Sequence, residues 1–285
     1  MDISSSLLGD VIAAEEKAEI DDTDLQVGEA SGVDTEVGTE APGLSEEEAC
    51  GPVGDQPASP PVEESNIQTV RVAELAGAPL LFLRGGSQDE TSFPAAPEFA
   101  AKLEQTAKVI VGRAPDGFGR LESIASAGIF VDRPPSLHAK GRACDWDVVR
   151  FAEVKISPLG HDHADESAAK RIRYWSLAAL IRSCSAFVLH AEFNADHEDH
   201  IHQDDGGRFA FDRGSGTTVK LVQALCNEVY GLTPPLVVDG SFGELSQTAL
   251  RTAMDAVHVE GDVTDAGTWR RFLRRSGRLG FQKSL

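Results

Sequence analysis

Two short stretches decide how this sequence is interpreted, SLHAKGRACD at 136–145 and DHIHQD at 199–204. Each follows a segment rich in apolar and β-branched residues, SIASAGIFV at 123–131 and SAFVLHAEF at 185–193, and both segments predict strands. Histidine and aspartate are common zinc ligands, and a catalytic zinc has three protein ligands with one position left open. The two stretches therefore predict a metal site in a fold of strands and helices.

In the first stretch, His138 and Asp145 lie seven residues apart and need not share a helix face. Gly141 suits a tight turn, and Ala143 is small enough to lie on the same strand face as Asp145. A loop that turns at Gly141 and returns as a strand brings His138 and Asp145 to one point.

In the second stretch, His200 and His202 would point to the same side of a strand. One imidazole can then bind a metal while the other orients or protonates a substrate. Asp199 lies three residues before His202 and reaches the site if the strand bends. A second pair of the same spacing, His161 and His163, lies in a polar loop, and such runs are also typical of solvated loops. Spacing does not choose between the two pairs.

The acidity of the chain is concentrated at its N-terminus. Residues 1–66 hold 18 of the 46 acidic residues and only one basic residue, Lys17. The rest of the chain carries 28 acidic and 25 basic residues, a net charge of −3. Because residues 1–66 are also poor in aromatic side chains, they cannot bury enough apolar surface to fold, and they predict a disordered acidic tail.

Several classes of protein are excluded by composition. No basic stripe with interleaved aromatic residues occurs, so no nucleic acid is expected as a partner. No apolar run reaches about 18 residues, so no membrane insertion is expected. The N-terminus lacks the positive and apolar regions of a signal peptide. The four cysteines form no CxxC pair, which favours a reduced compartment over a disulfide scaffold.

Helical spacing appears at 97–113 and 166–182, beside the predicted strands. A polar, glycine-containing stretch at 211–218 follows and is typical of a linker. Three further helical patterns follow, at 219–232, 237–257 and 268–281. We therefore expect a first domain at 67–212 and a small helical domain at 213–285.

Taken together, the motifs resemble the superfamily of D-Ala-D-Ala carboxypeptidases, lysostaphin-type endopeptidases and the hedgehog fold, and most closely its extensin-like C-terminal domain branch. That branch shows S-x-x-H-x-x-G-x-A-x-D, sometimes one residue shorter between Ser and His, then R-x-C-x-x-F and N-x-x-H-x-x-H-x-H-x-D. This sequence has the shorter form at 136–145, RSCSAF at 182–187 and NADHEDHIHQD at 194–204. The resemblance covers roughly residues 70–206.

The resemblance implies an α+β fold, in which an antiparallel sheet with flanking helices surrounds a zinc site. It implies His138, Asp145 and His202 as the zinc ligands and leaves His161 and His163 outside every motif. His200 takes the place of the catalytic first histidine of H-x-H. The general base is left open between Asp199 and His200, because an aspartate replaces the longer glutamate. Arg133 is the nearest candidate for an arginine that binds a substrate carboxylate.

The C-terminal segment resembles three-helix peptidoglycan-binding modules. Their signatures V-x-x-L-Q, D-G-x-F-G and T-x-x-A-[LV] are approached by LVQAL at 221–225, DGSFG at 239–243 and TAL at 248–250. Gly240 and Gly243 permit the turn into the next helix, and Phe242 anchors that turn in a small core.

The expected function is therefore a zinc-dependent peptidase, carboxypeptidase or endopeptidase, that hydrolyses amide bonds in the peptide stems of peptidoglycan. The alternative is a non-catalytic zinc-containing protein that binds or supports the cell wall. Without a signal peptide, the protein is expected to be made in the cytoplasm and to act on the wall after release or delivery. A phage endolysin or virion protein, a delivered toxin and a housekeeping hydrolase fit this expectation, and the acidic tail is a candidate contact for a delivery partner.

Overall fold

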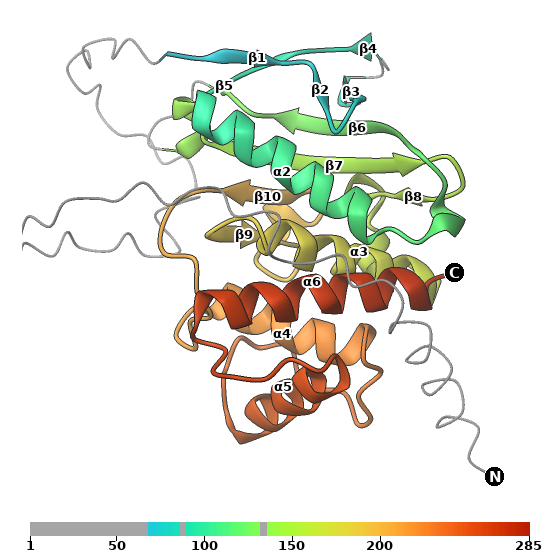
Figure 1. The fold of residues 1–285 in the computed structure, drawn as a ribbon, viewed down its shortest axis with the longest axis vertical. Coiled ribbons are helices and arrows are strands. Elements are labelled where there is room, and N and C mark those ends of the chain that lie inside the picture. The colour runs from blue at the N-terminus through green and yellow to red at the C-terminus, as the bar shows by residue number, and fades with distance from the viewer. Residues whose placement is uncertain (1–67, 86–88, 132–135) are drawn as a thin grey trace, which may run out of the picture. The chain divides into compact units, whose positions relative to one another are not determined.

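The computed structural model describes residues 68–85, 89–131 and 136–285. These residues fall within one compact unit, Glu46–Leu285. They form an α+β fold of five α-helices and mixed sheets, as the sequence predicts (Figure 1). The acidic tail predicted at 1–66 and the substrate-binding candidate Arg133 lie outside the described residues.

The larger sheet has the strand order β2-β3-β6-β7-β10-β9, with β4 paired to β3 and β8 paired to β7. Its strands are β2 (Glu74–Leu75), β3 (Ala78–Phe82), β4 (Asp89–Glu90), β6 (Leu121–Gly128), β7 (Ala143–Phe151), β8 (Lys155–Ile156), β9 (Phe187–Leu189) and β10 (Ile201–Asp204). A separate pair joins β1 (Val70–Val72) to β5 (Phe93–Ala95).

The sheet is mixed, which corrects the expectation of an antiparallel sheet. Strands β3 and β6 pair in parallel, whereas the other ladders are antiparallel. Parallel neighbours require a long crossover connection, and here the chain passes through β4, β5 and helix α2 (Pro97–Arg113) before it enters β6. The parallel pair is therefore a consequence of the helical connection.

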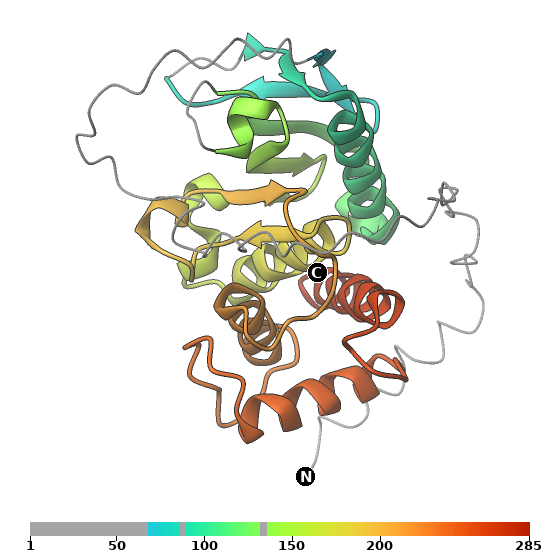
Figure 2. The same cartoon turned by 90° about the vertical axis from the view of Figure 1, so that its left-hand side faces the viewer.

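Helix α2 has the bounds that the sequence predicts. Pro97 occupies the first turn, where its missing N–H has no cost, and Pro115 follows the end of the helix. Phe99, Leu103 and Ile110 are buried at helical spacing and form the face that packs on the sheet. Figures 1 and 2 show α2 lying across one face of the strands.

The alternation of side chains along β7 and β10 separates two faces of the sheet. Trp146 Nε1 donates to Gln203 Oε1 at 2.8 Å, and Gln203 Nε2 donates to Thr106 of α2 at 3.1 Å. Trp146 and Gln203 therefore lie on the face that α2 covers. Because successive residues of a strand point to opposite faces, Asp145 and His202 lie on the other face.

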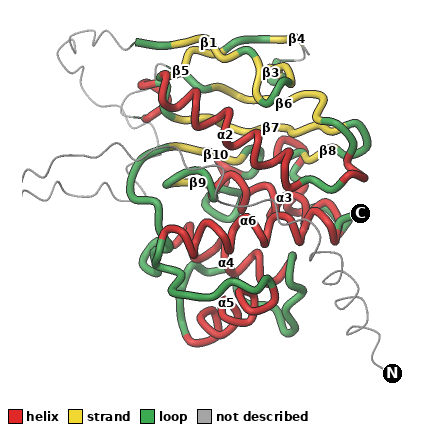
Figure 3. The backbone as a smooth tube through the Cα atoms, in the orientation of Figure 1, coloured by secondary structure: helices red, strands yellow, loops and turns green. Residues whose placement is uncertain are grey.

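Three helices follow the sheet in sequence: α4 (Gly216–Glu228), α5 (Glu244–Ala256) and α6 (Ala266–Lys283), drawn in red in Figure 3. Helix α6 packs closely on α3 (Ala168–Arg182), because a Cβ added at Gly277 would lie 2.5 Å from Leu180 Cγ. The C-terminal helices thus contact the part of the chain that holds the sheet. The domain boundary at 212/213 stays a prediction.

The motif residues of the C-terminal segment hold one loop together. Gln223 of α4 donates to Asp239 Oδ1 at 2.9 Å and accepts from the backbone N of Gly240 at 3.0 Å. Gly240 has a left-handed φ of 79°, as the sequence analysis expects of a turn glycine. Phe242 packs against the core through Phe211, with ring centroids 5.0 Å apart.

Within the described ranges, no helix combines the length and the apolar character needed to cross a membrane. The three described cysteines, Cys144, Cys184 and Cys226, are free thiols.

Candidate metal centre

His138 is positioned by a short 3-10 turn, Leu137–Lys140, that precedes β7. The hydroxyl of Ser136 caps the turn by accepting from the backbone N of His138 at 3.2 Å. Gly141 ends the turn at a left-handed φ of 64°, where a Cβ would lie 2.9 Å from Ala96 N. The Nδ1–H of His138 is placed to donate to the carbonyl of Ile129 at 3.2 Å. With this bond kept, the lone pair of Nε2 would face a metal ion bound at the site.

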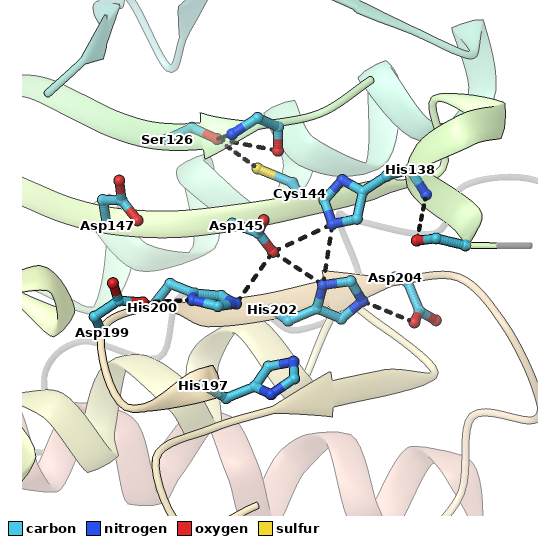
Figure 4. A network of polar contacts seen from close by, with 12 residues as sticks. Ser126, His138, Cys144, Asp145, Asp147, His197, Asp199, His200, His202 and Asp204 are labelled. Carbon is cyan, nitrogen blue, oxygen red and sulfur yellow. Dashed lines mark hydrogen bonds and ion pairs between the residues drawn. The ribbon is translucent and has the colours of Figure 1, made fainter. Parts of the chain in front are cut away.

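Asp145 and His202 reach the same point from neighbouring strands, because they are register partners in the β7–β10 pair. Oδ1 of Asp145 lies 2.9 Å from Nδ1 of His202 and 3.3 Å from Nε2 of His138. The two imidazole nitrogens are 3.3 Å apart. Figure 4 shows the three side chains converging on one point, as the sequence motifs predict.

The spacing of these three atoms fits one metal ion. All the donor atoms lie within 4.8 Å of one another. Neighbouring ligands of a tetrahedral ion with bonds of about 2.0–2.1 Å are separated by about 3.3 Å, close to the three distances observed. The donor set of two imidazoles and one carboxylate is also one that divalent transition metals accept. His138, Asp145 and His202 thus form a candidate metal-binding triad.

The close contacts within the triad shift the pKa values of His202 and Asp145 in opposite directions. Burial disfavours the charged form of His202, but hydrogen bonds to Asp145 and Asp204 outweigh that cost and raise its pKa to about 9. Burial also opposes ionisation of Asp145, yet the hydrogen bonds of His138 and His202 hold the pKa of its carboxyl well below the usual range. A metal at the triad must therefore displace a proton from His202.

Asp204 fixes the far side of the His202 ring. Its Oδ2 accepts from Nε2 of His202 at 3.1 Å, and its Oδ1 accepts from the backbone N of Gly206 at 2.7 Å. Asp204 is only 5% exposed, so this arrangement is shielded from solvent. A carboxylate behind a metal-ligating histidine holds the ring and selects the tautomer whose other nitrogen faces the metal.

His200 borders the triad and is held by Asp199. Nε2 of His200 lies 3.6 Å from Oδ1 of Asp145, while its Nδ1 lies 2.8 Å from Oδ1 of Asp199. The second oxygen of Asp199 accepts from Nη1 of Arg84 at 2.9 Å. Although partial burial opposes it, the hydrogen bonds from Arg84 and His200 lower the pKa of Asp199. Both carboxylate oxygens of Asp199 are thus engaged by cationic or polar neighbours.

Arg84 is a site residue that the sequence analysis missed. It pairs with both oxygens of Asp147 through Nε at 2.9 Å and Nη2 at 2.8 Å. The side chain of Asp147 is fully buried. Asp147 lies two residues beyond Asp145 on β7 and therefore points to the same face, which is a signal available in the sequence. Its partner Arg84 follows β3, and only the sheet order brings it close.

His197 is a second residue that sequence reasoning did not place at the site. It is buried, and its ring centroid lies 4.9 Å from that of His200 and 6.0 Å from that of His202. Its Nδ1 lies 2.6 Å from Oδ1 of Asn194. Burial and the neighbouring histidines lower its pKa to about 3, so the ring stays neutral near pH 7.

The alternative pair His161 and His163 does not join the triad. The two rings pack edge to face at 5.8 Å, and His163 also packs against Tyr174 at 5.4 Å. Among the residues that the structure describes, only one group of three potential metal ligands lies close enough to hold an ion, and it contains neither residue.

Comparisons of this chain with protein-family models, with curated proteins and with solved structures found no match.

Proposed function

We propose that this protein is a zinc-dependent peptidase that hydrolyses amide bonds in the peptide stems of peptidoglycan. The observation that carries the proposal is the convergence of His138 Nε2, Asp145 Oδ1 and His202 Nδ1 at spacings that suit a tetrahedral ion. The motif resemblance at 136–145 and 194–204 supports the same ligand set and favours zinc. The peptidoglycan-binding-like motifs after residue 212 support the polymer as substrate.

Zinc bound at the triad would polarise a scissile carbonyl and provide a nucleophile at neutral pH. The residues around the triad supply the proton transfers. His200 presents Nε2 towards Asp145 and is held through Nδ1 by the carboxylate of Asp199. This pair has the arrangement of a base whose ring is oriented by a carboxylate.

The geometry favours His200 over Asp199 as the general base. Both oxygens of Asp199 are engaged, one by His200 and one by Arg84, and its lowered pKa makes it a weak proton acceptor. In this proposal Nε2 of His200 accepts a proton from the attacking water, and Asp199 stabilises the resulting imidazolium. His200 then passes the proton to the leaving amine. Arg84 holds Asp199 in place.

The C-terminal helices would retain the enzyme on its insoluble substrate. Such retention raises the local concentration of enzyme at the wall without changing the chemistry. In the Gln223 loop one side chain bonds both Asp239 and Gly240, which gives this part of the chain a fixed surface.

The proposal is tested with the full chain and its His202→Ala variant. We expect one equivalent of zinc by elemental analysis and a loss of turbidity when purified sacculi are added, with both properties absent from the variant. A His202→Ala protein that still lysed sacculi would overturn the assignment. If the unmodified chain lyses sacculi, mass spectrometry of the released muropeptides identifies the bond that is cut.

The same experiment distinguishes the zinc peptidase from the non-catalytic alternative. One observation favours the non-catalytic alternative. The carboxylate of Asp199 forms an ion pair with Arg84, so it is not free to accept a proton. Stoichiometric zinc without lysis of sacculi from several sources would support a wall-binding protein that retains the metal site.

A further inference from the structure

Three arginines meet where the N-terminal half of α6 approaches the end of α3. Arg182 is the last residue of α3, and Arg270 and Arg274 lie one turn apart on α6. The guanidinium carbon of Arg182 lies 5.2 Å from the ring centroid of Phe209, and that of Arg270 lies 4.6 Å from the same centroid. Phe209 belongs to the segment between β10 and α4, which passes the start of α6 in Figure 1. We call Arg182, Arg270 and Arg274 the arginine cluster.

Arg274 is buried without a protein partner. The residue is only 8% exposed, and its Nε is a buried atom that makes no hydrogen bond. None of the described residues forms a hydrogen bond or an ion pair with its guanidinium group. A polar N–H removed from water is costly unless it is hydrogen-bonded, so the buried Nε–H of Arg274 indicates a missing acceptor.

Arg182 and Arg270 do not bring a negative charge close to Arg274. Arg182 donates to the carbonyl oxygens of Ser185 at 2.6 Å and Ala210 at 2.8 Å, and carbonyls leave its positive charge in place. Among the described residues, no carboxylate oxygen lies within 4.0 Å of a guanidinium nitrogen of the cluster. Like charges one turn apart on a helix also repel each other, which applies to Arg270 and Arg274.

We propose that the arginine cluster binds an oxyanion of the phosphate class. Guanidinium groups match tetrahedral oxyanions through paired N–H donors, and Nε of Arg274 is one such donor in a shielded position. The ring of Phe209 holds Arg270 beside it, so part of the entropy of ordering that side chain is lost before the anion arrives. The ligand is either free phosphate or a phosphodiester in an anionic polymer. This site is separate from the metal triad and does not depend on the proposed peptidase activity.

The test uses the full chain, its Arg274→Gln variant and an Arg251→Gln control. Arg251 lies on α5, is exposed and loses the same unit of charge when substituted. Inorganic phosphate is titrated by calorimetry and by its effect on the melting temperature, with chloride replacing it at constant ionic strength. A second series uses glycerophosphoglycerol, a soluble phosphodiester.

We expect saturable binding of phosphate by the unmodified chain and by Arg251→Gln, and an affinity at least about tenfold lower for Arg274→Gln. Arg274→Gln should remain folded, because the change removes a charge that no described residue pairs with. Binding of the diester would identify a polymer as the source, and binding of inorganic phosphate alone would identify the free ion. Equal binding by Arg274→Gln, or no saturable binding of either probe, would overturn the proposal.

Discussion

His202 and Asp145 are register partners in adjacent strands, and their side-chain atoms Nδ1 and Oδ1 lie 2.9 Å apart. The pairing of β10 with β7 therefore sets the metal triad. A slip of one residue would place Gln203 opposite Asp145 and would turn His202 towards α2. The contact between Trp146 and Gln203 on the α2 face opposes that slip, because it requires the same register.

Replacing Asp204 should weaken metal binding without removing a ligand. In Asp204→Asn the carboxylate that accepts from His202 Nε2 loses its charge, so the ring and its tautomer are held less firmly. We expect zinc affinity to fall by about 10–100-fold. Competition with a chromophoric chelator at fixed pH measures the change. Asp196→Asn removes an exposed carboxylate from the short 3-10 turn Ala195–His197 before β10 and should leave the affinity within about twofold. Equal affinities of the two variants would show that Asp204 does not position His202.

Gly141 should be the most sensitive glycine near the site. Its φ is 64°, and a Cβ there would meet backbone atoms of Ala95 and Ala96 at 2.9–3.2 Å. We expect Gly141→Ala to reduce the free energy of unfolding by about 2 kcal/mol, since an incompatible φ adds to the steric contact.

Gly112→Ala is the matched control for that change. Gly112 is exposed in the last turn of α2, and no atom lies within 4 Å of an added Cβ. Alanine should stabilise the chain there by a few tenths of a kcal/mol, up to about 1 kcal/mol. Guanidinium unfolding of both variants measures the difference. A Gly141→Ala protein as stable as the unmodified chain would contradict the role assigned to the turn.

The sequence predicts the triad well because its information is local. His138, Gly141 and Asp145 lie in one ten-residue stretch, and the alternation of a strand places His202. Helix α2 is likewise predicted to its end residues, because the apolar spacing and the flanking prolines agree. These features depend on neighbours within a few positions along the chain.

The other features of the fold and of the site depend on pairings between distant segments, and local sequence patterns do not encode such pairings. Arg84 contacts Asp199 across 115 positions of the chain, and only the sheet order brings the two together. The parallel pairing of β3 with β6 is of the same kind. This contact also changes the interpretation of Asp199, which the resemblance left as one of two candidates for the general base.

Arg84 should stabilise the fold through Asp147. Arg84→Met would leave the fully buried carboxylate of Asp147 without its bidentate partner. Breaking such a pair costs about 3–5 kcal/mol, and the partial exposure of Arg84 reduces the expected loss to about 2 kcal/mol. Urea unfolding measures the change.

Two variants make that measurement specific. Arg84→Met combined with Asp147→Asn should recover part of the loss, because the second change removes the unpaired charge. Arg120→Met breaks an exposed pair with Glu122 and should change stability by no more than about 0.5 kcal/mol. If Arg84→Met matched Arg120→Met, the pair with Asp147 would have no structural role.

His190 should make the stability of the protein depend on pH. The ring is fully buried, its Nε2–H donates to the carbonyl of Thr217 at 3.1 Å, and burial lowers its pKa to about 4. A histidine in the unfolded chain has a pKa of about 6.5. Between these two values the unfolded state binds more protons than the folded state, so the free energy of unfolding rises with pH. The contribution is complete above about pH 6.5 and is lost as the pH falls towards 4.

His190→Gln removes this titration while its amide N–H can still donate to Thr217. Urea unfolding of both proteins at intervals from pH 4.5 to 7.5 should therefore give a shallower pH dependence for the variant. The gap between the two curves should change by about 2–3 kcal/mol across that interval, because one pKa unit corresponds to about 1.4 kcal/mol. Parallel curves would mean that His190 titrates alike in the folded and unfolded states. In that case the buried ring would have a route to water that its packing against Trp175 and Thr217 does not show.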